Sequence, residues 1–388
     1  MIVDTDYALV GGGLANGLIA LAIKARQPEA RIAMIERGEA PGGNHTWCFH
    51  AADITAETAS WIEPLVVTRW TGYDVAFPEH RRQLDSPYAC VTSDRLAERV
   101  THALAAPGSQ LLTRTTAVEV GTDYVTMQAQ DGSLSTLRAR AVIEARGPDH
   151  AVPDHAVPRA CAWQKFLGME VRLTRPHGLE RPMLMDATVP QRDGFRFCYV
   201  LPLAPDRLLI EDTYFSDGTR LDVTELRGEI LRYAAAHGWT IAEIVREEVG
   251  VLALPWQGDP PDGRAPLIAG YAGGWFHPVT GYSFPIAARL AAFVAERPAD
   301  QLFGPALDEL AERHARQLDF ALRLNGMLFK WFPPAQRYHV LSRFYRLPEA
   351  IIQRFYALEL TALDRARILV GRPPRGLSLR AVFGREAT

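Results

Sequence analysis

A glycine-rich turn near the start of the chain is the feature that most constrains its fold. Residues 7–10 are apolar and β-prone, Gly11, Gly12 and Gly13 follow, and residues 14–25 are rich in Ala, Leu and Ile. A strand, a tight turn and a helix in this order begin a dinucleotide-binding β-α-β unit. Gly11 permits the turn, and Gly13 lets a pyrophosphate approach the free N–H groups of the helix. We expect dinucleotide contacts from Gly11, Gly13, Leu14, Ala15 and Asn16, with Asn16 in place of the usual third glycine.

A second apolar run, residues 31–35, ends in Glu36, 25 residues after Gly11. An acid at this point binds the hydroxyls of an adenosine ribose and disfavours a 2′-phosphate. Residues 41–47 read Pro-Gly-Gly-Asn-His-Thr-Trp, where many two-dinucleotide-domain flavoproteins carry a glycine pair. A plain glycine turn is the alternative interpretation. We therefore predict FAD as the dinucleotide, with further contacts from Glu36, Gly43, Asn44 and His45.

Two later apolar segments complete such a domain. Residues 141–147 end in Gly147, and residues 267–270 end in Gly270 ahead of a helix predicted over 285–296. The N-terminus of that helix can face the flavin. Many flavin monooxygenases carry a Gly-Asp pair at this turn, whereas Gly270 is followed by Tyr271, so the hydroxylase family itself is a poor match. The remaining cofactor contacts are expected from Gly147, Gly270, Gly273, Thr280 and Gly281.

Between these segments the sequence pattern changes from alternating strands and helices to successive strands. Four β-prone runs separated by Pro, Gly and Asp turns predict an antiparallel sheet over residues 165–174, 181–189, 194–203 and 207–215. The predicted class is α/β, with a hydroxylase-like, Rossmann-type FAD-binding domain, an interleaved antiparallel-sheet substrate domain and a helical C-terminal tail. The FAD-binding domain is expected from residues 1–50, 85–150 and 255–297, the substrate domain from 51–84 and 151–254, and the helical region closing the cavity from 298–388.

Composition indicates a soluble globular protein, because 48% of the residues are hydrophobic and 22% are charged. The four cysteines form no CxxC pair, which favours a reducing compartment and predicts no metal site. The chain shows neither a basic leader nor an apolar run long enough to span a bilayer. We therefore expect a cytoplasmic protein whose membrane contact is peripheral.

Charge is unevenly distributed along the chain. Residues 320–388 carry 12 Lys and Arg against 4 Asp and Glu, a net charge of +8, although the whole chain has a net charge of -3. Nine aromatic residues are interleaved with these charges between residues 320 and 356, a mixture suited to an anionic membrane surface. Aromatic residues at helical spacing are equally typical of a packed core. Nucleic acid is not expected as a partner, because the body is acidic and carries no such motif.

Three clusters, residues 42–47, 209–213 and 277–282, together resemble the lycopene β-cyclases of carotenoid-making bacteria. The resemblance extends over nearly the whole chain, from residues 14–17 to 354–356. It implies an intramolecular lyase that cyclises both ends of linear lycopene, and of other acyclic carotenoids, to β-rings through γ-carotene. It also implies a requirement for reduced FAD without net redox change, with NAD(P)H as the external reductant.

Ring closure needs a proton for the terminal alkene, so it needs an acid in a dry cavity. Glu211 and Asp212 are neighbours on a predicted strand and must point to opposite faces. The resemblance makes Glu211 the catalytic acid. Asp212 is a second catalytic candidate, and it lies either on the other face or on the flavin side. Burial should keep Glu211 protonated, whereas a solvated acidic turn is the alternative. His277 is the final base, a hydrogen-bonding partner near the flavin or a structural histidine.

Two other functions share these features. An FAD-dependent polyprenyl or carotenoid oxidoreductase, of the reductase or epoxidase type, can use the same fold. It would consume NAD(P)H in proportion to product and would not need the acid at Glu211. A non-enzymatic lipid-binding protein is the second alternative, and it would have no reason to keep a phosphate-binding turn.

Overall fold

The computed structural model describes residues 4–147 and 160–378, so residues 379–388 of the predicted helical region lie outside it. Its first sheet has the strand order β8-β2-β1-β11-β10-β9, with β17 also paired to β11. These strands are β1 (Thr5–Val10), β2 (Ile32–Ile35), β8 (Gln110–Leu112), β9 (Thr116–Val120), β10 (Tyr124–Gln128), β11 (Leu134–Glu144) and β17 (Leu267–Ile268). β1 runs parallel to both β2 and β11, as a Rossmann-type unit requires.

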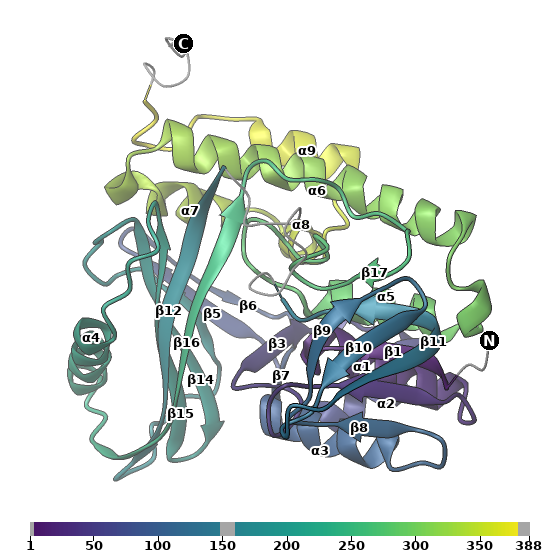
Figure 1. The fold of residues 1–388 in the computed structure, drawn as a ribbon. Helices are drawn as coiled ribbons and strands as arrows, with labels where there is room; N and C mark the ends of the chain where they lie inside the picture. Colours follow the sequence, from purple (N-terminus) through teal and green to yellow (C-terminus); the bar gives the residue numbers. More distant parts are fainter. Residues whose placement is uncertain (1–3, 148–159, 379–388) are drawn as a thin grey trace.

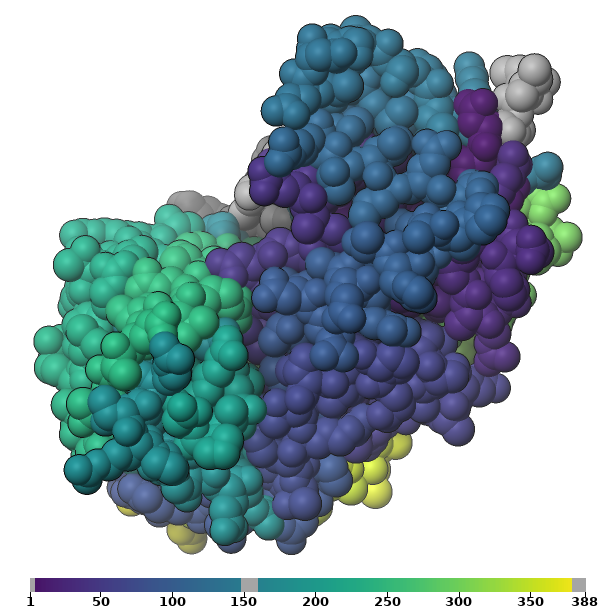
Figure 2. Space-filling model, turned by 90° about the horizontal axis from the view of Figure 1, so that it is seen from below, coloured from purple at the N-terminus to yellow at the C-terminus, as the bar shows by residue number. Residues whose placement is uncertain are grey.

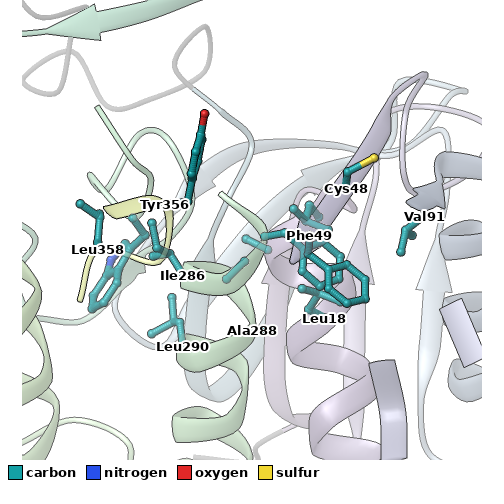
Figure 3. Packing of buried hydrophobic residues seen from close by; sticks show 14 of the residues in the cluster. Leu18, Cys48, Phe49, Val91, Ile286, Ala288, Leu290, Tyr356 and Leu358 are labelled. Carbon is teal, nitrogen blue, oxygen red and sulfur yellow. The ribbon is translucent and has the colours of Figure 1, made fainter. Parts of the chain in front are cut away.

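Helices α1 and α5 pack together against this sheet. Their packing brings together the predicted turns that precede them in the chain. Leu18 of α1, Phe49 of β3 and Ala288 of α5 meet in one buried cluster (Figure 3). The Phe49 and Phe284 rings stack with centroids 4.6 Å apart. The helices of this part are α1 (Leu14–Arg26), α2 (Ala56–Ile62), α3 (Ser93–Leu104) and α5 (Phe284–Ala295). The helices predicted from residues 14 and 285 are therefore confirmed to within one residue at each end.

The second sheet is mostly antiparallel, with the order β16-β12-β15-β14-β13-β5-β6. Its strands are β5 (Tyr73–Phe77), β6 (His80–Leu84), β12 (Cys161–Leu173), β13 (Met183–Asp186), β14 (Phe195–Ala204), β15 (Arg207–Ser216) and β16 (Ile241–Pro255). The four predicted strands are confirmed as β12 to β15. Sequence reasoning did not assign β5, β6, β16 or the helix α4 (Val223–Ala236), which packs on the outer face (Figure 1).

A small third sheet links the two large ones. It has the order β3-β7-β4, with β3 (Thr46–His50), β4 (Thr68–Trp70) and β7 (Tyr88–Thr92). Seen from below, the teal and green residues of the second sheet lie beside the purple and blue part that contains the first sheet (Figure 2). β4 falls within the predicted substrate segment 51–84 but pairs with β7. The domain ranges stay a prediction, because the third sheet takes strands from both sets.

The C-terminal region is helical, with α6 (Pro305–Trp331), α7 (Tyr338–Phe344), α8 (Glu349–Tyr356) and α9 (Ala362–Leu369). The long helix α6 extends across the top of both large sheets (Figure 1). Short 3-10 helices occupy Ala51–Asp53, Glu63–Leu65, Ala299–Gln301 and Pro334–Gln336. No helix in residues 4–147 and 160–378 is long and apolar enough to cross a membrane.

The aromatic residues of the tail pack mainly as core. Phe329, Phe332, Tyr345, Phe355 and Tyr356 are buried. Phe320, Tyr338 and Phe344 are partly buried against the same cluster. The packed-core interpretation is therefore confirmed for these side chains, and they are not free to enter a bilayer. Any membrane contact of this region needs other residues.

Candidate active site

A cavity of about 1510 Å³ lies between the first and second sheets. Typical ligand pockets have roughly 300–1,000 Å³, so this one has room for a dinucleotide together with a long substrate. Its walls come from the β1–α1 turn, the β3 strand, the end of β11, the inner face of the second sheet and residues 257–284. Aromatic and apolar side chains dominate the substrate side, among them Trp163, Phe166, Leu184, Met185, Phe197 and Phe215.

The β1–α1 turn has the geometry of an anion site. Gly11 has φ of +89°, and a Cβ there would lie 2.9 Å from the Ala145 carbonyl oxygen, so the close approach of β1 and β11 requires glycine. Gly13 is the N-cap of α1 without a side-chain cap, and its first turn carries no acid. A Cβ at Gly13 would meet nothing within 4 Å. Open space in front of uncapped N–H groups suits a pyrophosphate.

Glu36 is fixed beside this turn by the backbone. Its Oε2 accepts from the Gly12 N–H at 2.7 Å, and its Oε1 accepts from the Gly38 N–H at 2.6 Å. A carboxylate oxygen accepts more than one hydrogen bond. Glu36 therefore keeps capacity for the ribose hydroxyls that the sequence predicts as its ligands, although it lies outside the cavity wall itself.

Three predicted cofactor contacts lie elsewhere. Asn16 is buried behind the turn, where its Nδ2 donates to the carbonyls of Val10 and Gly11, both at 2.9 Å. Asn44 joins β16 instead, because its Nδ2 donates to the Glu247 carbonyl at 2.8 Å. Gly43 is exposed beside it. Asn16 thus holds the shape of the turn, and the positions of Asn16, Gly43 and Asn44 do not support direct cofactor contact.

Nine of the predicted cofactor contacts line the cavity, whereas Gly11 shapes the turn before them. The α5 N-terminus, with Ser283 and Phe284, also lines the cavity and has no side-chain cap. Two helix N-termini and a run of small residues are what the phosphates and flat ring of a flavin dinucleotide need. The predicted contacts that line the cavity are Gly13, Leu14, Ala15, His45, Gly147, Gly270, Gly273, Thr280 and Gly281.

Glu211 lies in the middle of β15 and projects into the cavity. The Thr213 hydroxyl donates to Glu211 Oε1 at 2.5 Å. Burial, reinforced by the negative charge of Glu248, raises the pKa of Glu211 to about 8. The carboxyl group is therefore mostly protonated at neutral pH, and its place within a strand does not fit a solvated turn.

Asp212 points to the opposite face of the sheet, as strand alternation predicted. Its carboxylate receives two hydrogen bonds from Arg196, at 2.8 and 3.0 Å, and one from the Tyr214 hydroxyl at 3.1 Å. Arg196 also binds Glu229 of α4 at 2.9 Å. This position does not support a catalytic role for Asp212, because the side chain is fully buried and does not line the cavity. It joins the sheet to α4.

His277 is a structural histidine. Its Nδ1 accepts from the Val279 N–H at 3.2 Å, so the ring proton sits on Nε2, which donates to the Phe355 carbonyl at 2.9 Å. Burial lowers the pKa of His277 to about 3. Both nitrogens are engaged and the ring does not line the cavity, so the geometry supports the structural interpretation of His277 over a role as the final base. The ring ties residues 277–282 to α8.

Several cavity residues were missed by sequence reasoning. Glu248 of β16 is a second carboxyl group in the wall, and it was missed because no strand was assigned over residues 241–255. Tyrosines also reach the cavity from four separate segments: Tyr88, Tyr199, Tyr282 and Tyr356. Their convergence depends on long-range packing that no local motif shows.

Comparison with known proteins agrees with these features. The family model described as lycopene cyclase protein matches residues 6–381. This chain belongs to the lycopene cyclase family. It is 43% identical to the lycopene beta-cyclase of Pseudescherichia vulneris over 377 residues, which cover 95% of this chain and 94% of that relative.

Solved structures share the fold of this lycopene cyclase family member. A geranylgeranyl bacteriochlorophyll reductase-like protein from Thermoplasma acidophilum matches with a TM-score of 0.64 at 12% identity, covering 94% of this chain and 95% of that one. A flavoprotein/dehydrogenase from Cytophaga hutchinsonii matches with a TM-score of 0.63 at 14% identity, covering the same shares of the two chains. The predicted fold class is confirmed.

Replacing Gly13 by Val should weaken FAD binding while leaving the fold intact. The side chain would fill the open space before the α1 N-terminus, where a Cβ meets nothing within 4 Å. Loss of hydrogen bonds to a charged group costs about 1.5–3 kcal/mol, so the Kd should rise roughly 10- to 100-fold. Flavin fluorescence titration measures this, with urea unfolding as the check on stability.

The matched control is Gly218→Val, whose Cβ position is equally open but lies outside the cavity. It should bind FAD as the wild type does. Unchanged FAD affinity in Gly13→Val would show that the turn is not the phosphate site.

Proposed function

We propose that this chain is an FAD-dependent lycopene β-cyclase that converts both linear ends of lycopene to β-rings, through γ-carotene, without net oxidation or reduction. The observation that carries the proposal is Glu211, a carboxylic acid held protonated in an aromatic cavity wall. Membership of the lycopene cyclase family supports the substrate class. The same arrangement has no evident use in a hydride-transferring polyprenyl oxidoreductase.

Proton delivery starts from the free oxygen of Glu211. Because Thr213 donates to Oε1, the carboxyl proton sits on Oε2 and can be given to the terminal alkene. A new C–H bond then forms, and a tertiary carbocation remains on the substrate. The neighbouring double bond attacks it, closing the ring, and a ring proton leaves. One proton enters and one departs for each ring, so no electrons are exchanged.

The cavity must protect the cation from water and stabilise its charge. The faces of Tyr88, Tyr199, Tyr282 and Tyr356 are available for cation–π attraction in the cavity wall. Reduced FAD, when bound, supplies negative charge at its ring and stabilises the cation electrostatically. We propose NAD(P)H as the external reductant. Gly13, Leu14 and Ala15 would hold the phosphates, and Glu36 the ribose.

Substitution of Glu211 by Gln should abolish cyclisation, because the amide has no acidic proton to give. The purified FAD-loaded proteins are incubated without oxygen with lycopene in liposomes and dithionite or NADPH, and carotenoids are separated by chromatography. We expect β-carotene from the wild type with reduced flavin only, and a rate at least ~100-fold lower in Glu211→Gln.

The matched control for this experiment is Glu247→Gln, because Glu247 lies on β16 but pairs outside the cavity with Arg227 at 2.7 Å. It should cyclise normally. A wild-type product with a changed hydrogen count would instead support the polyprenyl oxidoreductase. FAD retention in Glu211→Gln must be shown, so that loss of cofactor is excluded.

We also propose that α9 docks the enzyme peripherally on the cytoplasmic face of an anionic membrane, where a hydrocarbon substrate is dissolved. Leu363, Leu369 and Val370 are 79%, 49% and 67% exposed. Arg367 and Arg372 are exposed beside them. Apolar side chains flanked by arginines suit the boundary between headgroups and acyl chains. This surface differs from the buried aromatic residues on which the sequence-based prediction depended.

Replacing Leu363 and Val370 by Ser should reduce binding to anionic liposomes at least ~10-fold, since burial of such a side chain contributes about 1.5–3 kcal/mol. Sedimentation with phosphatidylglycerol vesicles measures the bound fraction. Leu134→Ser, at an equally apolar position that is 65% exposed on β11, is the control and should bind normally. Equal binding of the double variant and the wild type would contradict the proposal.

A further inference from the structure

Glu211 shares the cavity wall with a second carboxyl group, Glu248. Gly168 of β12 pairs with Glu211 of β15 on one side and with Glu248 of β16 on the other. The three residues therefore form one row across the sheet, on its cavity face. A Cβ on Gly168 would lie 2.9 Å from Glu248 Cγ and 3.2 Å from its Oε1. The Glu248 side chain thus occupies the space over the glycine, between its own strand and Glu211.

Glu248 has a cationic partner. Its Oε2 accepts from Arg246 Nη1 at 2.9 Å and from the Thr46 hydroxyl at 3.3 Å. Arg246 Nη2 in turn donates to Thr46 Oγ1 at 2.6 Å, and its Nε binds Glu170 at 3.2 Å. These contacts fix the carboxylate in one place, with only 4% of its side chain exposed.

Glu211 has no such partner among the described residues. The side-chain hydrogen bond that it receives comes from the neutral Thr213 hydroxyl. When two carboxyl groups share a low-dielectric site, one is driven to hold a proton. Burial raises the pKa of Glu248 as well, but the charge of Arg246 and the hydrogen bonds from Arg246 and Thr46 act against this rise. Glu211 has no cation to offset its burial, so Glu248 carries the charge and Glu211 carries the proton.

We propose that Glu248 is a positioning residue for the acid: its fixed negative charge, held by Arg246 and Thr46 across Gly168, keeps Glu211 protonated between turnovers. The role of Glu211 as the acid rests on the proposed function. The charge relation between the two carboxyl groups is a property of the protein alone. It gives Gly168 a function as well, since any larger residue there would push Glu248 aside.

Several other titratable groups lie near the pair. Tyr199 of β14 lies opposite Glu211 of β15, and burial raises the pKa of its hydroxyl well above the usual value. Cys90 lies close to Glu248 and Glu170, and the pKa of its thiol is also raised well above its usual value. His45 lies near Arg246, and burial together with that charge lowers its pKa. Asp212 acts from the opposite face, where Arg196 pairs with it.

The sign of the pH dependence follows from Glu211. Its pKa is raised to about 8, so the proton-bearing form is present below that pH and is lost above it. Cyclisation should fall as pH rises through about 8. Removal of the Glu248 charge should lower the pKa of Glu211 and so move this loss of activity to lower pH. Arg246, without its carboxylate partner, should lower the pKa of Glu211 as well.

The test is an infrared titration of the Glu211 carboxyl C=O stretch in the FAD-loaded protein, identified by its absence in Glu211→Gln, together with pH–rate profiles for lycopene. In Glu248→Gln we expect the midpoint to fall by about one pH unit or more. Glu248→Asp keeps the charge, so its titration midpoint should stay closer to that of the wild type. Gly168→Ala keeps both acids but displaces Glu248, and should also lower the midpoint.

The control is Glu247→Gln, which alters the neighbouring residue outside the cavity and should leave the midpoint unchanged. An unchanged midpoint in soluble, folded Glu248→Gln and Gly168→Ala would overturn the inference. The infrared titration needs no substrate, so it decides the inference even if the wild type fails to cyclise lycopene. That failure would instead overturn the proposed function.

Discussion

The alternation of side chains along β15 is the constraint on which the rest of the site depends. Glu211 projects into the cavity, whereas the next residue, Asp212, forms a buried ion pair with Arg196 on the opposite face. Removing one partner of such a pair costs about 3–5 kcal/mol, so slippage of the strand by one residue is strongly disfavoured. The buried pair of Asp212 with Arg196 thereby fixes the register of β15, and this register places Glu211 in the cavity.

Both large sheets contribute to the cavity around Glu211. The first sheet positions two helix N-termini and small residues in the cavity wall. The second supplies aromatic faces and the row of Glu211, Gly168 and Glu248. α4 braces the back of that sheet through Glu229. A rigid wall suits a reaction in which a weak acid must meet an alkene without water.

Local sequence patterns predicted the parts of this structure that depend on local physics. The turn at Gly11, the helix after it and the opposite faces of Glu211 and Asp212 follow from short-range geometry. Asn16 was misassigned because its bonds reach back to the turn from behind. His277 depends on the Phe355 carbonyl, far along the chain. Glu248 belongs to an edge strand whose pairing with β12 no local pattern revealed.

The central claim is that an exchangeable carboxyl proton starts a ring closure without net redox change. The measurement that tests it most directly is mass spectrometry of the carotenoid formed from unlabelled lycopene in D2O with reduced FAD. The account predicts one carbon-bound deuterium for each ring formed and no other change in hydrogen count. A cyclic product without deuterium, or one that has gained or lost a pair of hydrogens, would contradict it.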